Sequence, residues 1–299
     1  AACGFAGPAV AYAPMRADAA AEQLARELGA VFVLDGPQVL PAFAPEAAVL
    51  LLRQQGPLRI SGRPVMGAPV SSAGMEEAEL CRLAACLHAG GTRTLGLGMS
   101  LGDLCMDEGF YPAVFAQLAE TVVRLREKTG LTAKIFDLGG GFGVSCRPDC
   151  PGPDLSACAE ALRAQTCALP EALQGVQLSM SPGRFLAAGG GVLVCRVVAV
   201  KPGPTAVLDV SAAQCLRLEK RGAYHAAAAL RTAGRPPLLQ QLTTLEQGAP
   251  FARQVLPQLR VGDPVIIRML GADGRSFSCA SERCPAYLLR ADGTIEPIE

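Results

Sequence analysis

The sequence predicts an α/β fold followed by a mostly β domain, and three observations lead to this class. Through about residue 190, short apolar runs alternate with segments of helical period, as parallel strands joined by crossover helices do. From residue 191 onward, strand-like runs such as VLVCRVVAVK and DPVIIRML follow one another between Gly, Pro and Asp. Hydrophobic residues make up 50% of the 299 residues, so the chain can bury a sizeable core. We expect a first domain over residues 1–192 and a second over residues 193–299.

The strands and helices of the first domain follow from this alternation. Helices that end near Gly29, Gly90 and Gly130, as C-caps require, are expected at 18–28, 75–88 and 111–128. Strands are expected at residues 10–15, 30–35, 48–53, 94–99, 133–138 and 176–180. A closed eight-stranded α/β barrel typically takes about 250 residues, so the first domain is short for one. The shortfall lies at GPQVLPAFAPEA, residues 36–47, which barely reaches the length of a parallel crossover.

Composition excludes several classes of function. The formal net charge is zero, and Lys and Arg are dispersed, which argues against nucleic-acid binding. No apolar run reaches the roughly 18 residues of a membrane span, so we expect a cytoplasmic protein without a membrane partner. The chain begins without Met, and we expect that a segment upstream of it is missing.

The 12 cysteines predict neither a metal site nor a disulfide framework. They form no CxxC pair, and only His88 and His225 could complete a mixed site, so no metal is expected. The favoured interpretation is that the cysteines are buried free thiols, because a domain with a large hydrophobic core is stable without disulfide bonds. Cysteines in apolar stretches are Cys81, Cys86, Cys158 and Cys195. The alternative is a bridge, for which the best candidates are Cys146 and Cys150 in a loop of Pro and Gly.

A glycine run marks the end of the strand at 133–138. Gly139, Gly140 and Gly141 follow it directly, and Gly143 comes after one phenylalanine. Backbone without a Cβ, at a loop entering a helix, suits close approach of an anion such as phosphate. Arg184 in SPGR would add a charge-assisted contact to a phosphate or a carboxylate. The alternative is that the glycines only make a tight turn and that Arg184 is a surface ion-pair residue.

Five ordered segments resemble one family, the fold-type III pyridoxal-phosphate-dependent decarboxylases that act on diaminopimelate, ornithine and arginine. They are YAPMRAD near the N-terminus, LGLGMSLGD at 95–103, DLGGGFG at 137–143, SPGRFLAAGGGVLVCRVVAVK at 181–201 and LPQLRVGDPVIIRMLGADGRSFS at 256–278. The resemblance implies an alanine-racemase-like (β/α) barrel, shortened by about two βα units, and a C-terminal β domain. It also implies pyridoxal phosphate as the cofactor, with its phosphate on the glycine run and Arg184, and a dimer with sites at the interface.

The residues that carry the family's chemistry differ here. Met15 stands in YAPM where the family has its Schiff-base lysine, and no other lysine of the chain matches that motif: Lys128, Lys134, Lys201 and Lys220. Four further positions depart from the family's pattern: Ser100 for a histidine that stacks on the cofactor ring, Ser181 for an acid that protonates the ring nitrogen, Leu245 for a cysteine, and Asp273 for a tyrosine. Cys279, in a serine-rich loop, could be a substitute nucleophile, but it is more simply a plain thiol.

Three hypotheses of function follow from this pattern. The first is a non-catalytic homologue that keeps the phosphate-binding loop and regulates a related decarboxylase as a homodimer or heterodimer. The second is an active decarboxylase of a basic amino acid or diaminopimelate. The third is a binder of a small molecule or phosphate-bearing ligand with no catalytic role. We expect no covalent attachment of pyridoxal phosphate under the first and third hypotheses.

Overall fold

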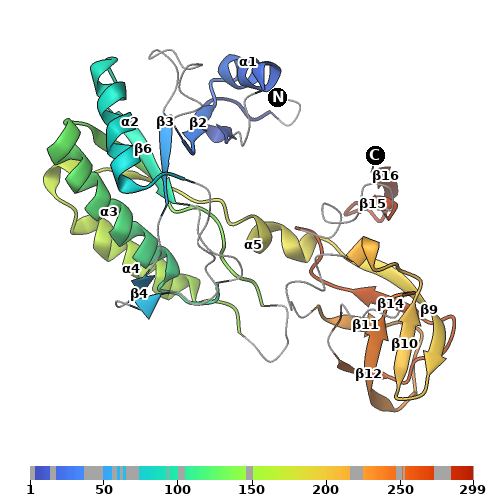
Figure 1. Cartoon of the computed structure of the whole chain (residues 1–299). Helices are drawn as coiled ribbons and strands as arrows, with labels where there is room; N and C mark the ends of the chain where they lie inside the picture. Colours follow the sequence, from blue (N-terminus) through green and yellow to red (C-terminus); the bar gives the residue numbers. More distant parts are fainter. Residues whose placement is uncertain are drawn as a thin grey trace. The chain divides into compact units, whose positions relative to one another are not determined.

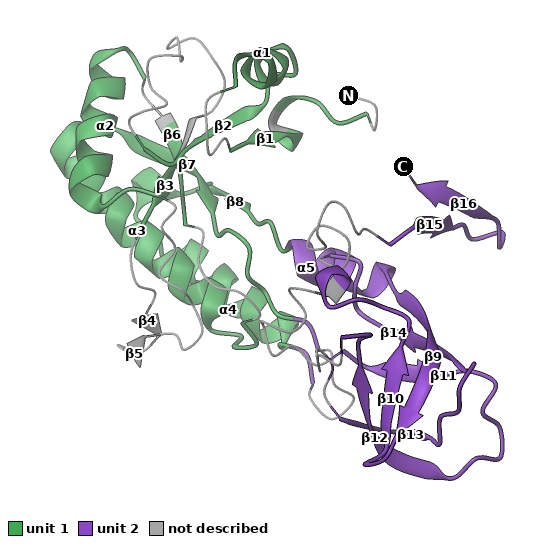
Figure 2. Ribbon diagram, turned by 45° about the vertical axis from the view of Figure 1, so that its right-hand side comes forward, with its two compact units in different colours: residues 1–143, 153–182 green, residues 144–152, 183–299 purple. Residues whose placement is uncertain are grey.

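The computed structural model describes residues 4–13, 18–36, 50–55, 59–60, 63–64, 74–92, 94–99, 105–145, 151–215, 225–246, 251, 253–272 and 284–298. The chain divides into two compact units (Figure 2). The first comprises residues 1–143 and 153–182, and the second comprises residues 144–152 and 183–299. The domain boundary at residues 192 and 193 stays a prediction.

The first unit is built on a six-stranded parallel sheet, drawn from blue to yellow in Figure 1. In sheet order its strands are β1 (Ala11–Tyr12), β2 (Val31–Leu34), β3 (Leu50–Gln54), β6 (Thr94–Met99), β7 (Thr132–Asp137) and β8 (Gln177–Ser179). They overlap the six runs predicted from apolar periodicity, and the predicted fold class is confirmed. Among the described strands β8 does not pair with β1, so this part of the sheet is a half-barrel with two ends. The shortened stretch at 36–47 lies, from residue 37 on, outside the described residues.

Helices connect these strands. The predicted ones are α1 (Ala19–Glu27), α2 (Glu77–Ala89) and α3 (Phe110–Thr129), and α3 ends on Gly130 in the left-handed conformation at φ 77°. Helix α4 (Leu155–Cys167) was not predicted. It begins at Asp154, whose side chain accepts hydrogen bonds from the next amides, as an N-cap residue does. Smaller elements of the unit are η1 (Gly7–Ala9), η3 (Glu171–Leu173) and the hairpin of β4 (Arg59–Ile60) and β5 (Arg63–Pro64).

The two faces of the parallel sheet differ in character. On the helix side, Leu97 and Phe136 are register partners without solvent exposure, and the Phe115 ring of α3 packs edge-on against Phe136 at 5.4 Å. Since side chains alternate along a strand, the next residues in register share the opposite face. That row runs from β3 to β8 through Arg53, Gly98, Asp137 and Ser179. Polar groups therefore collect on the face away from the helices, at the carboxyl end of the strands.

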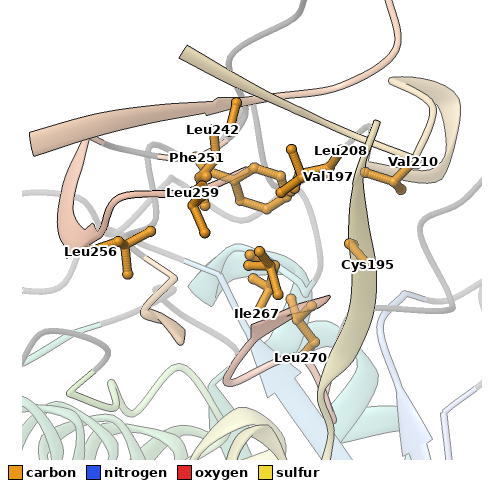
Figure 3. Packing of buried hydrophobic residues seen from close by; sticks show 12 residues of the cluster. Cys195, Val197, Leu208, Val210, Leu242, Phe251, Leu256, Leu259, Ile267 and Leu270 are labelled. Carbon is orange, nitrogen blue, oxygen red and sulfur yellow. The ribbon is translucent and has the colours of Figure 1, made fainter. Parts of the chain in front are cut away.

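The second unit is mostly β, as predicted. Its six-stranded sheet has the order β11-β14-β9-β10-β12-β13. The bounds are β9 (Leu193–Lys201), β10 (Thr205–Leu208), β11 (Ala227–Ala229), β12 (Pro237–Thr243), β13 (Gln254–Pro257) and β14 (Pro264–Ile267). Buried side chains from these strands form one hydrophobic cluster with the Phe251 ring, which is 1% exposed (Figure 3). Short helical elements precede or interrupt the sheet: α5 (Gly183–Ala187), η4 (Ala188–Gly190) and η5 (Ala213–Cys215).

A separate C-terminal hairpin pairs β15 (Ala286–Leu289) with β16 (Ile295–Ile298). One of its faces carries Tyr287, Leu289 and Ile295, which are 62%, 69% and 66% exposed. Isolated two-stranded hairpins are marginally stable in water, so an apolar ribbon of this kind gains from a covering surface.

The helices, the potential metal ligands and the cysteines of the described ranges bear on three expectations from composition. None of the described helices combines the length and the apolar character that crossing a membrane requires. The same residues contain no group of three or more metal-ligating side chains. The cysteines whose side chains are described are free thiols, and Cys158 and Cys195 are buried as expected. The expected burial of Cys86 is wrong, because helical geometry places it on the exposed side of α2.

Candidate anion-binding loop

The glycine run forms a loop at the carboxyl end of β7. Gly139 and Gly141 have φ angles of 69° and 90°, in the left-handed region that residues with a Cβ rarely adopt. These two glycines are therefore required by the shape of the backbone. The prediction of a loop that leaves the end of the strand holds for residues 138–143.

The other two glycines are required by neighbouring backbone. A Cβ atom on Gly140 would lie 2.7 Å from the carbonyl oxygen of Ser181, and one on Gly143 would lie 2.7 Å from that of Cys105. Such distances are shorter than van der Waals contact. At Gly140 and Gly143 the missing Cβ therefore makes room for neighbouring backbone, and the contact of these glycines with an anion stays a prediction.

Backbone hydrogen bonds hold the loop from both sides. The amide of Cys105 donates to the Gly141 carbonyl at 2.9 Å, and the Gly143 amide donates to the Cys105 carbonyl at 2.7 Å. On the other side the Ser181 amide donates to the Gly139 carbonyl at 2.9 Å. The loop is thus fixed by the segments that follow β6 and β8, the two strands that flank β7.

Two consecutive amides of the loop remain available to a ligand. The Gly139 amide donates to Asp137 Oδ1 at 3.1 Å. The amides of Gly140 and Gly141 have no hydrogen-bond acceptor within the described part of the chain, and both residues are half-buried. Adjacent amides of this kind suit a phosphate or another oxyanion.

An aromatic pair lies beneath the loop. The rings of Tyr111 on α3 and Phe142 in the loop stack at 4.8 Å with an interplanar angle of 26°, and both residues are almost fully buried. Burial, the largest cause, raises the pKa of Tyr111, so its phenol stays neutral near neutral pH. This packing supports the loop without adding charge.

A charged row crosses the sheet beside the loop, and sequence reasoning missed it. Arg53 of β3 forms an ion pair with Asp35, directly after β2, at 3.0 Å. Asp137 lies in register with Arg53 across Gly98. Burial raises the pKa of Asp137, while the Gly139 amide and the Arg53 charge act in the opposite direction. The only signal in the sequence was the position of all three residues at or after the ends of predicted strands.

The predicted site residues fall into three groups. Gly139, Gly140, Gly141 and Gly143 come together in the loop, and the Ser181 backbone binds the loop while the residue itself is exposed. Arg184, on α5, and Leu245, which is 51% exposed, belong to the second unit, so the predicted contact of Arg184 with a phosphate stays a prediction. Outside the described residues lie Met15, Ser100, Asp273, Cys146, Cys150 and Cys279.

Several known proteins are similar to this chain in sequence and in fold. The family model "Pyridoxal-dependent decarboxylase, pyridoxal binding domain" matches residues 73–188. Protein TabA of Pseudomonas amygdali pv. tabaci is 28% identical over 281 residues, which cover 90% of this chain and 66% of TabA. The diaminopimelate decarboxylase of Campylobacter jejuni is 31% identical over 170 residues, covering 54% of this chain and 40% of that protein. The chain therefore spans less than two thirds of the length of these relatives.

A solved structure gives the same result for the fold. Diaminopimelate decarboxylase from Helicobacter pylori, complexed with L-lysine, matches with a TM-score of 0.79 at 17% identity, over 99% of this chain and 77% of that one. The matched segment at 73–188 contains the glycine loop, and the model that matches it describes a pyridoxal-binding domain. The chain is therefore similar to pyridoxal-dependent decarboxylases, in sequence over residues 73–188 and in fold over nearly its whole length.

Proposed function

We propose that the chain is a non-catalytic homologue in this family, which binds pyridoxal phosphate or a similar phosphate-bearing ligand reversibly. One observation carries the proposal. The loop at 139–143 is fixed by backbone hydrogen bonds to Cys105 and Ser181 and offers the Gly140 and Gly141 amides, while Met15 stands where the family's motif has a lysine. A binding element made of backbone persists without the side chain that would hold the cofactor covalently.

The residues of the loop fit the phosphate end of the cofactor. Gly140 and Gly141 would donate their amides to its oxygens. Pyridoxal phosphate, when bound, supplies an electron sink for reactions at an amino-acid α-carbon. The fit at the other end is poor, because a thioether at Met15 cannot take the place of an amine.

The described lysines support reversible binding. Lys128 on α3 lies 3.5 Å from Glu77 on α2, in an exposed ion pair. Lys134 is an exposed residue of β7, three positions before its end, and Lys201 ends β9 in the second unit. None of the three follows the carboxyl end of a strand in the parallel sheet, where the loop lies.

The proposal extends to partners and location. We infer a homodimer, or a heterodimer with a related decarboxylase, in the cytoplasm. The exposed apolar side chains of the β15–β16 hairpin, among them Tyr287 and Leu289, support a partner surface in the second unit. Through such a partner the chain would regulate an active enzyme instead of acting on a substrate.

A cofactor titration tests the proposal. Purified protein should bind pyridoxal phosphate reversibly, inorganic phosphate should compete, and borohydride should leave no cofactor attached. Met15→Lys should gain a borohydride-fixed adduct. Attachment in the unmodified chain, unchanged by Met15→Lys, would contradict the non-catalytic assignment. Absence of any binding of pyridoxal phosphate or phosphate would contradict the loop's role.

The second candidate is an active decarboxylase, which the match of residues 73–188 to the pyridoxal-binding domain favours. It predicts release of CO₂ from diaminopimelate, lysine, ornithine or arginine in the presence of pyridoxal phosphate. We expect no release above that from protein-free cofactor. The third candidate, a phosphate binder with no relation to the cofactor, predicts that phosphate binds and that pyridoxal without a phosphate group leaves its affinity unchanged.

A further inference from the structure

The shape of the glycine loop depends on a carboxylate. Asp137, the last residue of β7, accepts the Gly139 amide through Oδ1 at 3.1 Å, and Gly139 then takes its left-handed φ of 69°. A side chain that hydrogen-bonds the backbone two residues on is a common way to fix a turn. Asp137 therefore occupies the first amide of the loop and leaves the next two for a ligand.

This arrangement contains an electrostatic conflict. An ionised carboxylate next to an anion-binding loop repels the anion, and in a partly buried site such repulsion is weakly screened. Burial already disfavours the charge of Asp137, since it raises the pKa of that carboxyl. The loop needs the carboxylate as an acceptor but would bind an anion better without its charge.

Arg53 resolves the conflict. It lies in register with Asp137 on the same face of the sheet, and the residue between them, Gly98, has no side chain to separate the charges. The charge of Arg53 favours the ionised form of Asp137. Asp35 holds the guanidinium at 3.0 Å. The other neighbours of Asp137 among the described residues are uncharged near neutral pH: the Ser179 hydroxyl on β8 and the Tyr111 phenol on α3, whose pKa burial raises.

We propose that Asp137 and Arg53 are positioning residues for the anion-binding loop. The carboxylate holds Gly139 in place, and the guanidinium offsets the carboxylate charge so that an anion can bind at the next two amides. The role of Arg53 is thus exerted through Asp137. The inference rests on the proposed function of the loop.

Sulfate binding, measured by isothermal titration calorimetry, tests the pair, because the charge of sulfate is constant around neutral pH. Asp137→Ala removes the acceptor and should lower the affinity for sulfate about tenfold. Asp137→Asn keeps an acceptor oxygen, so its affinity for sulfate should stay within about threefold of that of the unmodified chain. Arg53→Gln leaves the carboxylate charge uncompensated and should weaken sulfate about tenfold, more so at alkaline than at acidic pH. The double variant Arg53→Gln/Asp137→Asn should recover affinity to within about threefold of the original.

Arg124→Gln is the matched control. Arg124 also forms a partly buried ion pair, with Glu77 at 3.0 Å between α2 and α3, but it does not touch the loop, so sulfate affinity should not change. Circular dichroism and the melting temperature verify that each variant is folded. If Arg53→Gln alone fails to fold, the comparison of Asp137→Asn with the double variant still decides, because with asparagine at 137 the second change should have little effect.

The outcomes separate this inference from the proposed function. If the unmodified chain binds neither sulfate nor pyridoxal phosphate, the proposed function is wrong, and the inference fails with it. If the unmodified chain binds sulfate but the double variant is as weak as Arg53→Gln, or Asp137→Asn is as weak as Asp137→Ala, only the positioning role is wrong. If the double variant recovers its affinity for sulfate, and this affinity no longer depends on pH, the positioning role is supported.

Discussion

Asp137 in the first unit and Asp263 in the second each accept a hydrogen bond from a nearby backbone amide, but in opposite electrostatic states. Asp137 accepts the Gly139 amide at 3.1 Å, and Asp263 accepts the Arg260 amide at 2.7 Å. Asp263 in addition receives two hydrogen bonds from the guanidinium of Arg235, one of them at 3.1 Å. Asp137 has its arginine, Arg53, only as a neighbour across a glycine.

The difference appears in the pKa values of the two carboxyls. The Arg235 hydrogen bonds hold the pKa of Asp263 below its usual range, while burial raises the pKa of Asp137. A directly paired carboxylate stabilises the fold, whereas one kept partly uncompensated beside free amides is typical of a functional site. The comparison teaches that an aspartate bound to a nearby backbone amide serves stability in one unit and, by our proposal, ligand binding in the other.

The largest expected effect comes from breaking the Asp263 pair. Asp263→Ala leaves Arg235, whose side chain is 18% exposed, without its partner and should lower the free energy of unfolding by about 3 kcal/mol. Urea unfolding followed by circular dichroism measures it. Arg290→Ala, which breaks the exposed pair with Glu296, should leave the unfolding midpoint nearly unchanged. Equal effects of the two changes would mean that Asp263 holds its turn no more firmly than a surface pair does.

A glycine of the loop at 139–143 and a glycine next to Asp263 provide the next test. Gly143→Ala places a Cβ 2.7 Å from the Cys105 carbonyl and should cost about 2 kcal/mol. Gly262→Ala has nothing within 4 Å of its Cβ but keeps a φ of 92°, so strain alone should cost about 1 kcal/mol. Melting temperatures of the two variants rank them. A larger loss at Gly262 would show that the loop at 139–143 yields readily and is not fixed by its neighbours.

The smallest effect, and the only one of opposite sign, is expected from neutralising Asp137. Since its folded-state pKa is raised, its charge opposes folding at neutral pH, and Asp137→Asn should raise the melting temperature there. The gain should vanish as the pH falls well below about 3.9, where the carboxyl is protonated in the unfolded chain as well. Asp263→Asn should behave in the opposite way, because its lowered pKa contributes stability that is present above about 3.9 and lost at more acid pH. If the melting temperatures of the two variants changed with pH in the same direction, the proposed electrostatic difference between the two aspartates would be wrong.

Periodicity predicted the parallel sheet well because its strands are short, mostly apolar runs that alternate with segments of helical period. The strand expected at 94–99 is β6, and the one expected at 133–138 overlaps β7. Helix α4 was missed although Asp154 is a good N-cap residue, because it follows a Pro- and Gly-rich stretch that reads as a long loop.

The site was predicted only as far as local sequence determines it. The glycine loop was found from its own residues, but the reason for Gly140 and Gly143 depends on Ser181 and Cys105, which are distant in sequence. The charged row was not found because it depends on strand register, and a shift of one residue would move Arg53 to the opposite face of the sheet. Pairings between strands are the information that a single sequence expresses least directly.

The linear order of the parallel sheet has a consequence for how the chain folds. Along the described sheet, the strands follow one another in the order of the sequence, from β1 at one end to β8 at the other. A closed barrel must bring its first and last strands together, which is a contact of long sequence separation and slows folding. Here each described strand of the sheet pairs with a strand that comes earlier in the sequence. The sheet can therefore be extended strand by strand while the chain is being synthesised. We expect β1 to β3 to form a folding nucleus before α4 and β8 have been made.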